Sequence, residues 1–267
     1  MLYKAEYLDV NTLDGYISTI EGGVRESETL RTVNGKDRSG KVNVGPVNGG
    51  VGSSSETEST FSFGDHQVSK LKRLIDAGHE DPESTGWVEV LEPDSAFSDI
   101  GSGALLEWEC EAYIPELSSL MANGKEVSQT IRGFRAMLPF AAASGWDTAN
   151  MPDSSSLEAM SSFLERMDLS PVIVGEGYDT DWKVVGTLDK RWIVPGAQFE
   201  GPYKIVGKVR KTIASEKWYP LLSLPGMNAL GRDRRRQMER QGPKDPSEEG
   251  QFIAGPAVIL DILAVYR

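Results

Sequence analysis

The chain has 267 residues, 39% of them hydrophobic, and a net charge of −12 at pH 7. This composition supports a packed core, and the length suits one large or two modest domains. The acidic balance argues against a protein whose whole surface binds nucleic acid or anionic lipid. A single cysteine excludes an internal disulfide framework and a cysteine-based zinc site. Because no apolar run reaches ~18 residues and the N-terminus lacks a signal-peptide core, we expect a cytoplasmic protein.

The N-terminal stretch predicts two helices separated by a long loop. Asp9 can cap a helix with apolar residues at helical spacing, and Gly22 supplies its end. The second helix is expected to begin after Asp65 and to close at Gly78. Residues 31–60, between them, are rich in glycine and serine and have no aromatic residue, so a mobile loop is predicted. The alternative is a hairpin that forms against a partner or a membrane.

Two strands followed by three helices are predicted between residues 86 and 167. Residues 86–92 and 104–114 predict strands, the second with Cys110 on its apolar face. A short helix is expected to follow Pro115, and a longer one is expected to kink or end at Pro139. The longer helix is expected to carry an apolar stripe of Val127, Ile131, Phe134, Met137 and Leu138. The core stripe expected on the next helix is Leu157, Met160, Phe163, Leu164 and Met167.

The pattern changes from helical to alternating after Pro171. Four predicted strands are separated by glycine and proline turns. They cover residues 171–176, 182–189, 203–213 and 217–224. A basic helix near residues 228–240 interrupts them, and the apolar stretch 252–266 predicts one central strand or two strands bent at Gly255-Pro256.

These elements predict an α+β fold. Helices dominate the N-terminal half, and a mainly antiparallel sheet, with the C-terminal strand at its centre, fills the C-terminal third. Residues 143–156 lack periodic apolar positions and are the candidate boundary. The expected parts are therefore 1–145 and 146–267, unless the chain forms one domain over 1–267.

Sequence patterns for established chemistries are missing, so we predict no catalytic residue, no metal ligand and no cofactor. His66 and His79 have no second histidine or cysteine at ligand spacing, and each is expected at the surface. Neither a phosphate-binding loop nor a nucleophile elbow occurs. Cys110 is expected in the core, where a thiolate is costly.

Two rows of acidic residues keep an enzymatic alternative open. The glutamates of the first row lie on one face of a predicted strand. The second row has two aspartates followed by a lysine, an order that is found in metal-dependent nucleases. The rows are Glu107, Glu109 and Glu111, and Asp179 and Asp181 with Lys183. We interpret both as solvated strand faces, and a metal-dependent nuclease or phosphodiesterase is the alternative.

Positive charge is concentrated between Lys204 and Lys244. Eleven basic and three acidic residues give this segment +8 and leave −20 for the remainder. The asymmetry indicates a basic docking patch or internal pairing with the acidic part. Helical spacing places four arginines on one face, and these are the predicted partner-binding residues: Arg232, Arg235, Arg236 and Arg240. An acidic protein surface suits them as a partner, and the overall charge disfavours nucleic acid.

Two groups of residues, one near each end of the chain, carry a resemblance to a known family. They are Tyr7, Leu8, Asp9, Tyr16, Gly22 and Gly23, and Gly207, Val209, Gly255, Pro256, Ala257, Tyr266 and Arg267. In these positions the chain resembles the bacterial domain of unknown function 6414 family, whose members are similar to a component of the Dodola antiviral defence system. The resemblance implies a role in phage defence beside a Clp-type AAA+ ATPase and transfers no catalytic residue. We therefore expect a non-enzymatic binding or adaptor protein with a protein partner.

Overall fold

A computed structural model describes residues 3–22, 28–30, 61–63, 66–145, 152–166, 169–224 and 231–267. The helices are α1 (Val10–Glu21), α2 (Gln67–Glu80), α3 (Pro82–Thr85), α4 (Pro93–Asp99), α5 (Glu116–Ala122), α6 (Gly124–Ala143), α7 (Ser154–Glu165) and α8 (Arg232–Gln241), with short 3-10 helices η1 (Lys190–Trp192), η2 (Leu221–Ser223) and η3 (Pro246–Gln251). The strands are β1 (Ala5–Leu8), β2 (Glu28–Leu30), β3 (Phe61–Phe63), β4 (Trp87–Val90), β5 (Leu105–Tyr113), β6 (Val172–Glu176), β7 (Lys183–Thr187), β8 (Gly201–Ile213), β9 (Trp218–Pro220), β10 (Phe252–Ala254) and β11 (Ala257–Tyr266). The predicted loop 31–60, the predicted cap Asp65 and Met167 lie outside the described residues.

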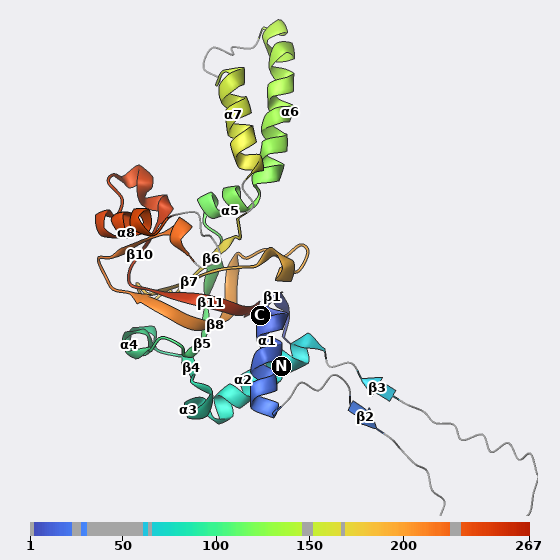
Figure 1. Cartoon of the computed structure of the whole chain (residues 1–267), viewed down its shortest axis with the longest axis vertical. Helices are drawn as coiled ribbons and strands as arrows, with labels where there is room; N and C mark the ends of the chain where they lie inside the picture. Colours follow the sequence, from blue (N-terminus) through green and yellow to red (C-terminus); the bar gives the residue numbers. More distant parts are fainter. Residues whose placement is uncertain are drawn as a thin grey trace, which may run out of the picture.

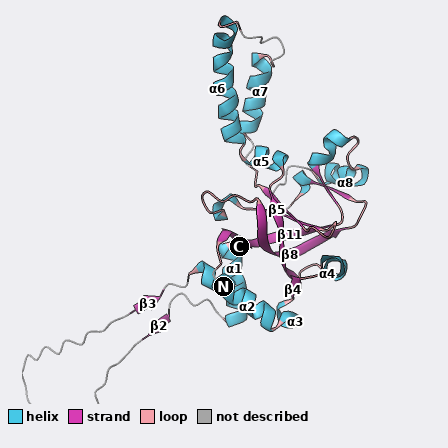
Figure 2. Cartoon of the chain, turned by 180° about the vertical axis from the view of Figure 1, so that it is seen from behind, coloured by secondary structure: helices cyan, strands magenta, loops and turns pink. Residues whose placement is uncertain are grey.

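The main sheet closes on itself as a small barrel (Figures 1 and 2). β8 pairs with both β11 and β5, and β7 and β6 connect β11 to β5 on the other side, so the hydrogen-bonded path returns to its start. β1 and β4 extend this sheet beside β11 and β5. The pairs β4–β5 and β7–β11 are parallel, whereas the other pairs are antiparallel. The α+β fold with its C-terminal strand at the centre of the sheet is therefore confirmed.

The barrel takes strands from both expected parts of the chain. β5 precedes the candidate boundary at residues 143–156, and β6, β7, β8 and β11 follow it. The bend at Gly255-Pro256 also agrees with expectation, because it separates β10 from β11. The predicted strand 217–224 is shorter than expected: pairing stops at Pro220, which has no backbone N–H to donate, and η2 follows. A division of the chain into two domains stays a prediction.

The interior of the barrel holds the main apolar core. Trp108 and Cys110 point inward from β5, as the alternation predicts, and burial raises the pKa of the Cys110 thiol to about 12. β6 and β7 contribute glycines because the interior has no room for another side chain. A Cβ on Gly175 would lie 2.4 Å from Cys110 Sγ, and one on Gly186 would lie 2.4 Å from Ile262 Cγ1. These two glycines let larger side chains from neighbouring strands fill a narrow barrel.

α1 and α2 cover the outer face of the barrel at one end. Asp9 caps α1 through the Thr12 N–H and Gly22 ends it in the left-handed conformation, as predicted. α2 is capped by His66, and it continues beyond Gly78 to Glu80, so the predicted helix end is wrong. The reason is packing: Gly78 lies against the indole of Trp87, and a Cβ there would be 2.3 Å from Trp87 Cδ2. Glycine at this position permits the helix to approach β4 closely.

α6 and α7 form a helical hairpin that stands clear of the barrel (Figures 1 and 2). α7 begins at Asp153, whose carboxylate accepts hydrogen bonds from the N–H groups of Ser155 and Ser156. Pro139 does not end α6, which continues to Ala143. Proline removes one backbone hydrogen bond and crowds the carbonyl four residues before it, yet the helix continues for four residues beyond Pro139. Among the helices described, none has both the length and the apolar content to cross a membrane.

Candidate functional site

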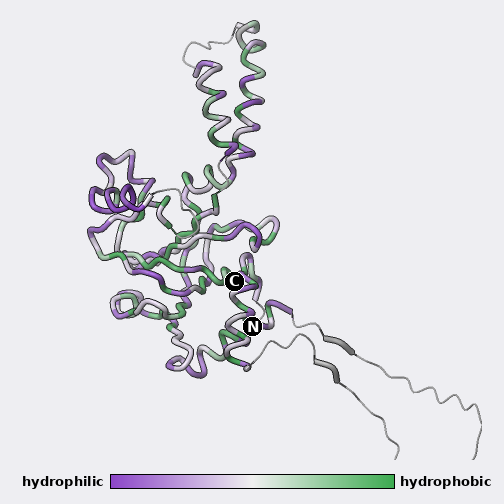
Figure 3. The backbone as a smooth tube through the Cα atoms, in the orientation of Figure 1, coloured by the Kyte–Doolittle hydropathy of each residue, from purple (hydrophilic) through white to green (hydrophobic). Residues whose placement is uncertain are grey.

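The four arginines predicted to bind a partner lie on α8, which packs on β9. Arg232, Arg236 and Arg240 are exposed, and Arg235 is half-buried. Within the described part of the chain, no carboxylate forms an ion pair with any of these four. The hydropathy colouring shows α8 as one of the most hydrophilic parts of the molecule (Figure 3). The geometry therefore leaves this group of charges available to another molecule.

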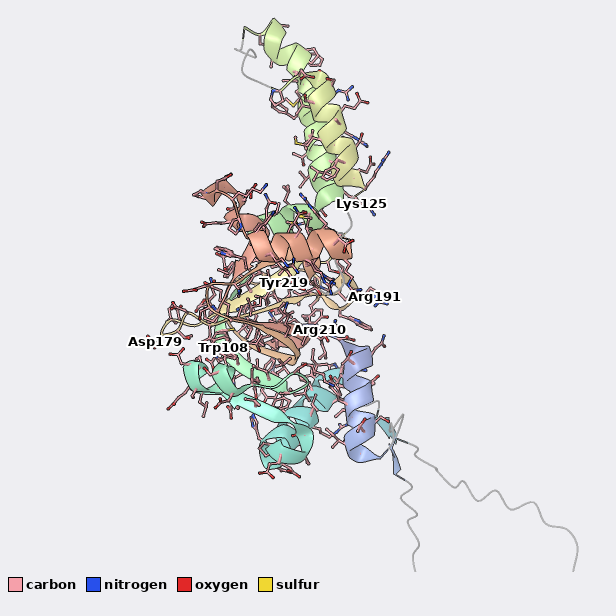
Figure 4. All side chains as sticks on the ribbon, turned by 60° about the vertical axis from the view of Figure 1, so that its left-hand side comes forward. Trp108, Lys125, Asp179, Arg191, Arg210 and Tyr219 are labelled. Atoms are coloured by element: carbon pink, nitrogen blue, oxygen red, sulfur yellow. The ribbon has the colours of Figure 1, made fainter. Side chains whose placement is uncertain are left out.

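Three other basic residues of the charged segment, Lys204, Arg210 and Lys211 of β8, contact acidic or aromatic side chains. Lys204 Nζ lies 3.4 Å from Glu107, and Arg210 Nε lies 2.7 Å from Asp261. Lys211 Nζ lies 4.7 Å from the centre of the Tyr219 ring, beneath α8 (Figure 4). Internal ion pairing is therefore present at Lys204 and Arg210 of β8, whereas the basic docking patch on α8 stays a prediction.

Polar contacts make up much of the interface between α6 and α7. The hydroxyl groups of Ser128 and Ser161 lie 3.4 Å apart and are buried. Arg132 forms an ion pair with Glu165 across the hairpin. Leu157 and Leu164 of α7 are the apolar side chains that the hairpin buries fully among its described residues, so much of its apolar surface faces away from the interface.

Five large apolar side chains are exposed on this hairpin, and we call them the hairpin stripe. They are Phe134, Met137 and Phe140 on α6, and Met160 and Phe163 on α7. Met137 is 67% exposed and Phe140 is 75% exposed. Leu157 and Leu164 are buried as predicted, but the prediction of a core stripe is wrong for its exposed members, Met160 and Phe163. The reason is that the hairpin rises above the barrel, and among the described elements no third one covers it (Figure 1).

The glutamate row on β5 is not uniformly solvated. Glu109 is exposed, and Glu111 is half-buried and accepts a hydrogen bond of 2.7 Å from the Tyr178 hydroxyl. Glu107 is only 2% exposed, so the interpretation of the row as a solvated face is wrong for this residue. The cause is α2, which brings His79 over this end of β5.

Glu107 is surrounded by polar groups from four other elements. His79 Nε2 of α2 lies 2.8 Å from Glu107 Oε2 and 3.8 Å from Glu89 Oε2 of β4. The Tyr266 hydroxyl of β11 donates to Glu107 Oε1, and burial together with this bond raises the pKa of Tyr266. Lys204 of β8 is the fifth member of what we call the Glu107 cluster. Sequence reasoning missed it because its members are far apart along the chain, although a carboxylate among the apolar residues of a strand was a visible signal.

The second acidic row lies beside a pocket of about 470 Å³. Asp181 and Lys183 line this pocket, but Lys183 Nζ is 2.6 Å from Glu176 and so is already neutralised. Asp179 is exposed and is not part of the lining (Figure 4). Among the described residues, three ligand atoms from histidine or carboxylate groups lie within 4.8 Å of one another only at His79, Glu89 and Glu107.

A closed barrel with flanking helices and a projecting helical hairpin defines the chain as a barrel-centred α+β protein. Residues 2–266 match the family model described as Domain of unknown function (DUF6414), and the chain belongs to this family. No curated protein and no solved structure matches it. The resemblance seen at the two ends is thus confirmed over nearly the whole chain.

Proposed function

We propose that the chain is a non-enzymatic binding or adaptor protein that acts in the bacterial cytoplasm, in antiviral defence, with a Clp-type AAA+ ATPase. The observation that carries this proposal is the hairpin stripe. Five large apolar side chains on a projecting hairpin are costly to expose to water, and such patches mark interaction sites. The defence role and the identity of the partner rest on the family resemblance.

The charge of α8 supports the same function. α8 lies at the end of the barrel from which the hairpin rises (Figures 1, 2 and 4). One partner can therefore contact the hairpin stripe and the four arginines together, if an apolar groove on its surface is bordered by carboxylates. Arginine forms bidentate hydrogen bonds with carboxylates, which gives such a contact orientation as well as attraction.

The double variant Met137→Ser/Phe140→Ser is expected to weaken binding to the ATPase at least about 100-fold, because two central apolar anchors are lost. The measurement is a Kd from biolayer interferometry, with the full chain and a Clp-type AAA+ ATPase as the two partners. Both side chains are largely exposed, so the circular dichroism spectrum and Tm stay unchanged. The matched control is Leu91→Ser/Tyr178→Ser, which removes two exposed apolar side chains outside the hairpin and leaves Kd unchanged.

The same assay examines the arginines. Replacing Arg232, Arg235, Arg236 and Arg240 with glutamate should weaken binding and reduce its dependence on salt, whereas four lysines should restore much of the affinity. Equal Kd values for the wild type, the stripe variant and the glutamate variant would overturn the proposal.

A metal-dependent nuclease or phosphodiesterase is the alternative function, because Asp181 and Lys183 share the pocket described above. Cleavage of DNA, RNA or a cyclic nucleotide that needs Mg²⁺ or Mn²⁺ and disappears in Asp181→Ala would favour this alternative. It would also contradict a non-enzymatic role.

A further inference from the structure

Two carboxylates face each other at the Glu107 cluster with too few positive charges beside them. The parallel register of β4 and β5 pairs Glu89 with Glu107, and like charges in directly opposite positions destabilise a sheet. Glu107 is 2% exposed, so water does not compensate its charge. Lys204 approaches Oε1 at 3.4 Å and offsets one of the two charges. A further cation beside Oε2 and Glu89 would complete the balance.

The geometry around Oε2 suits a metal ion as this cation. His79 Nε2, one Glu89 oxygen and one Glu107 oxygen all lie within 4.8 Å of one another. Atoms bound at about 2.1 Å to one ion lie roughly 3.0–3.4 Å apart, and the two separations from His79 Nε2, 2.8 and 3.8 Å, bracket that range. We propose that His79, Glu89 and Glu107 bind one divalent transition-metal ion.

The environment of the three ligands supports this assignment. The Tyr266 hydroxyl and Lys204 both contact Oε1 of Glu107, which orients the carboxylate and leaves Oε2 directed at His79. The side chains of His79 and Glu89 are 39% and 41% exposed, so an ion can enter from solvent and water can complete its coordination.

The ligand types select the ion. Mg²⁺ and Ca²⁺ prefer sites made entirely of oxygen, whereas one imidazole with two carboxylates suits Zn²⁺ or Mn²⁺, and Zn²⁺ binds such groups more tightly than Mn²⁺ does. We assign Zn²⁺ as the ion bound here. Because His79 belongs to α2 and the two glutamates to β4 and β5, the ion would attach α2 to the barrel.

The test is calorimetric titration of the full chain, stripped of metal by a chelator, with zinc chloride. The wild type is expected to bind one Zn²⁺ per chain. His79→Gln should abolish this binding, and Glu89→Gln should weaken it at least about tenfold, because each removes one ligand. Both substitutions change partly exposed side chains, so the variants can be compared with the wild type as folded proteins. Zinc should raise the Tm of the wild type and leave that of His79→Gln unchanged.

Two controls separate this site from zinc bound elsewhere. Glu109→Gln removes an exposed carboxylate from the same face of β5, and His66→Asn removes the other histidine while it keeps a side chain that can cap α2. Both should bind zinc with wild-type affinity. The proposal is overturned if the wild type shows no saturable binding, or if His79→Gln and Glu89→Gln bind zinc as tightly as the wild type. The site lies on the α2 side of the barrel, away from the hairpin, so these variants should still bind the ATPase (Figure 1).

Discussion

Trp108→Ala is expected to lower the free energy of unfolding by about 4 kcal/mol, because it removes the largest side chain that β5 places inside the barrel. Trp108 is 3% exposed, and its ring meets that of Phe97 edge-on at a centroid distance of 5.0 Å. The loss combines the transfer of an indole out of water with a cavity that a closed sheet cannot collapse around. Equilibrium unfolding in urea measures the difference.

Leu91→Ala is the control for this prediction, since Leu91 is exposed and should change the free energy of unfolding by less than about 0.5 kcal/mol. Trp108→Ala should also loosen the packing of α4, because Phe97 of α4 loses one of its two aromatic contacts and keeps the one with the Trp182 ring at 5.4 Å. Faster amide exchange in α4 of Trp108→Ala would show that the cavity reaches this helix. If Trp108→Ala lowered the free energy of unfolding by less than about 1 kcal/mol, the interior would not be packed as described.

Gly186→Ala is expected to lower the free energy of unfolding by about 2–3 kcal/mol, although it adds a single methyl group. The new Cβ would lie 2.4 Å from Ile262 Cγ1 and 2.8 Å from the backbone oxygen of Leu260. A side chain can shift, but a paired backbone oxygen cannot, so overpacking outweighs the entropy that alanine removes from the unfolded chain. Urea unfolding again gives the difference, and Gly101→Ala, with no atom within 4 Å, is the near-neutral control.

A double variant identifies the cause of this loss. Ile262→Ala removes one of the two contacts, so Gly186→Ala should cost less in that background by about 1 kcal/mol or more. Full additivity of the two changes would show that Ile262 is not the obstacle. Complete rescue would show that the Leu260 oxygen does not contribute.

Local patterns in the sequence were enough for much of the fold. The alternation along 104–114 identified the inward face of β5, and Asp9 and Gly22 marked the limits of α1. Closure of the barrel could not be predicted, because the β5–β8 pairing joins Leu105 to Lys208 and no local pattern specifies a partner so distant. Gly78 shows the same limit: its role depends on Trp87, which approaches only after α2 has packed on β4.

The candidate sites also differ in how far the sequence could predict them. Three of the four predicted arginines on α8 are exposed, whereas their role in partner binding stays a prediction. The stripes of α6 and α7 show regular spacing, but periodicity marks which residues share a face and not whether another element covers that face. The Glu107 cluster combines residues of α2, β4, β5, β8 and β11, so only the assembled fold brings it together.

The position of β11 has a consequence for how the protein is made. This strand is the last of the barrel to leave the ribosome, yet it pairs with β1, β7 and β8. Until it emerges, the earlier strands have no closed sheet to join, and their valine and isoleucine faces stay open to aggregation. Contacts between β1 and β11 also join positions near opposite ends of the chain, which slows the search for the native pairing. Newly made chains are therefore expected to depend on chaperones until β11 has emerged and paired.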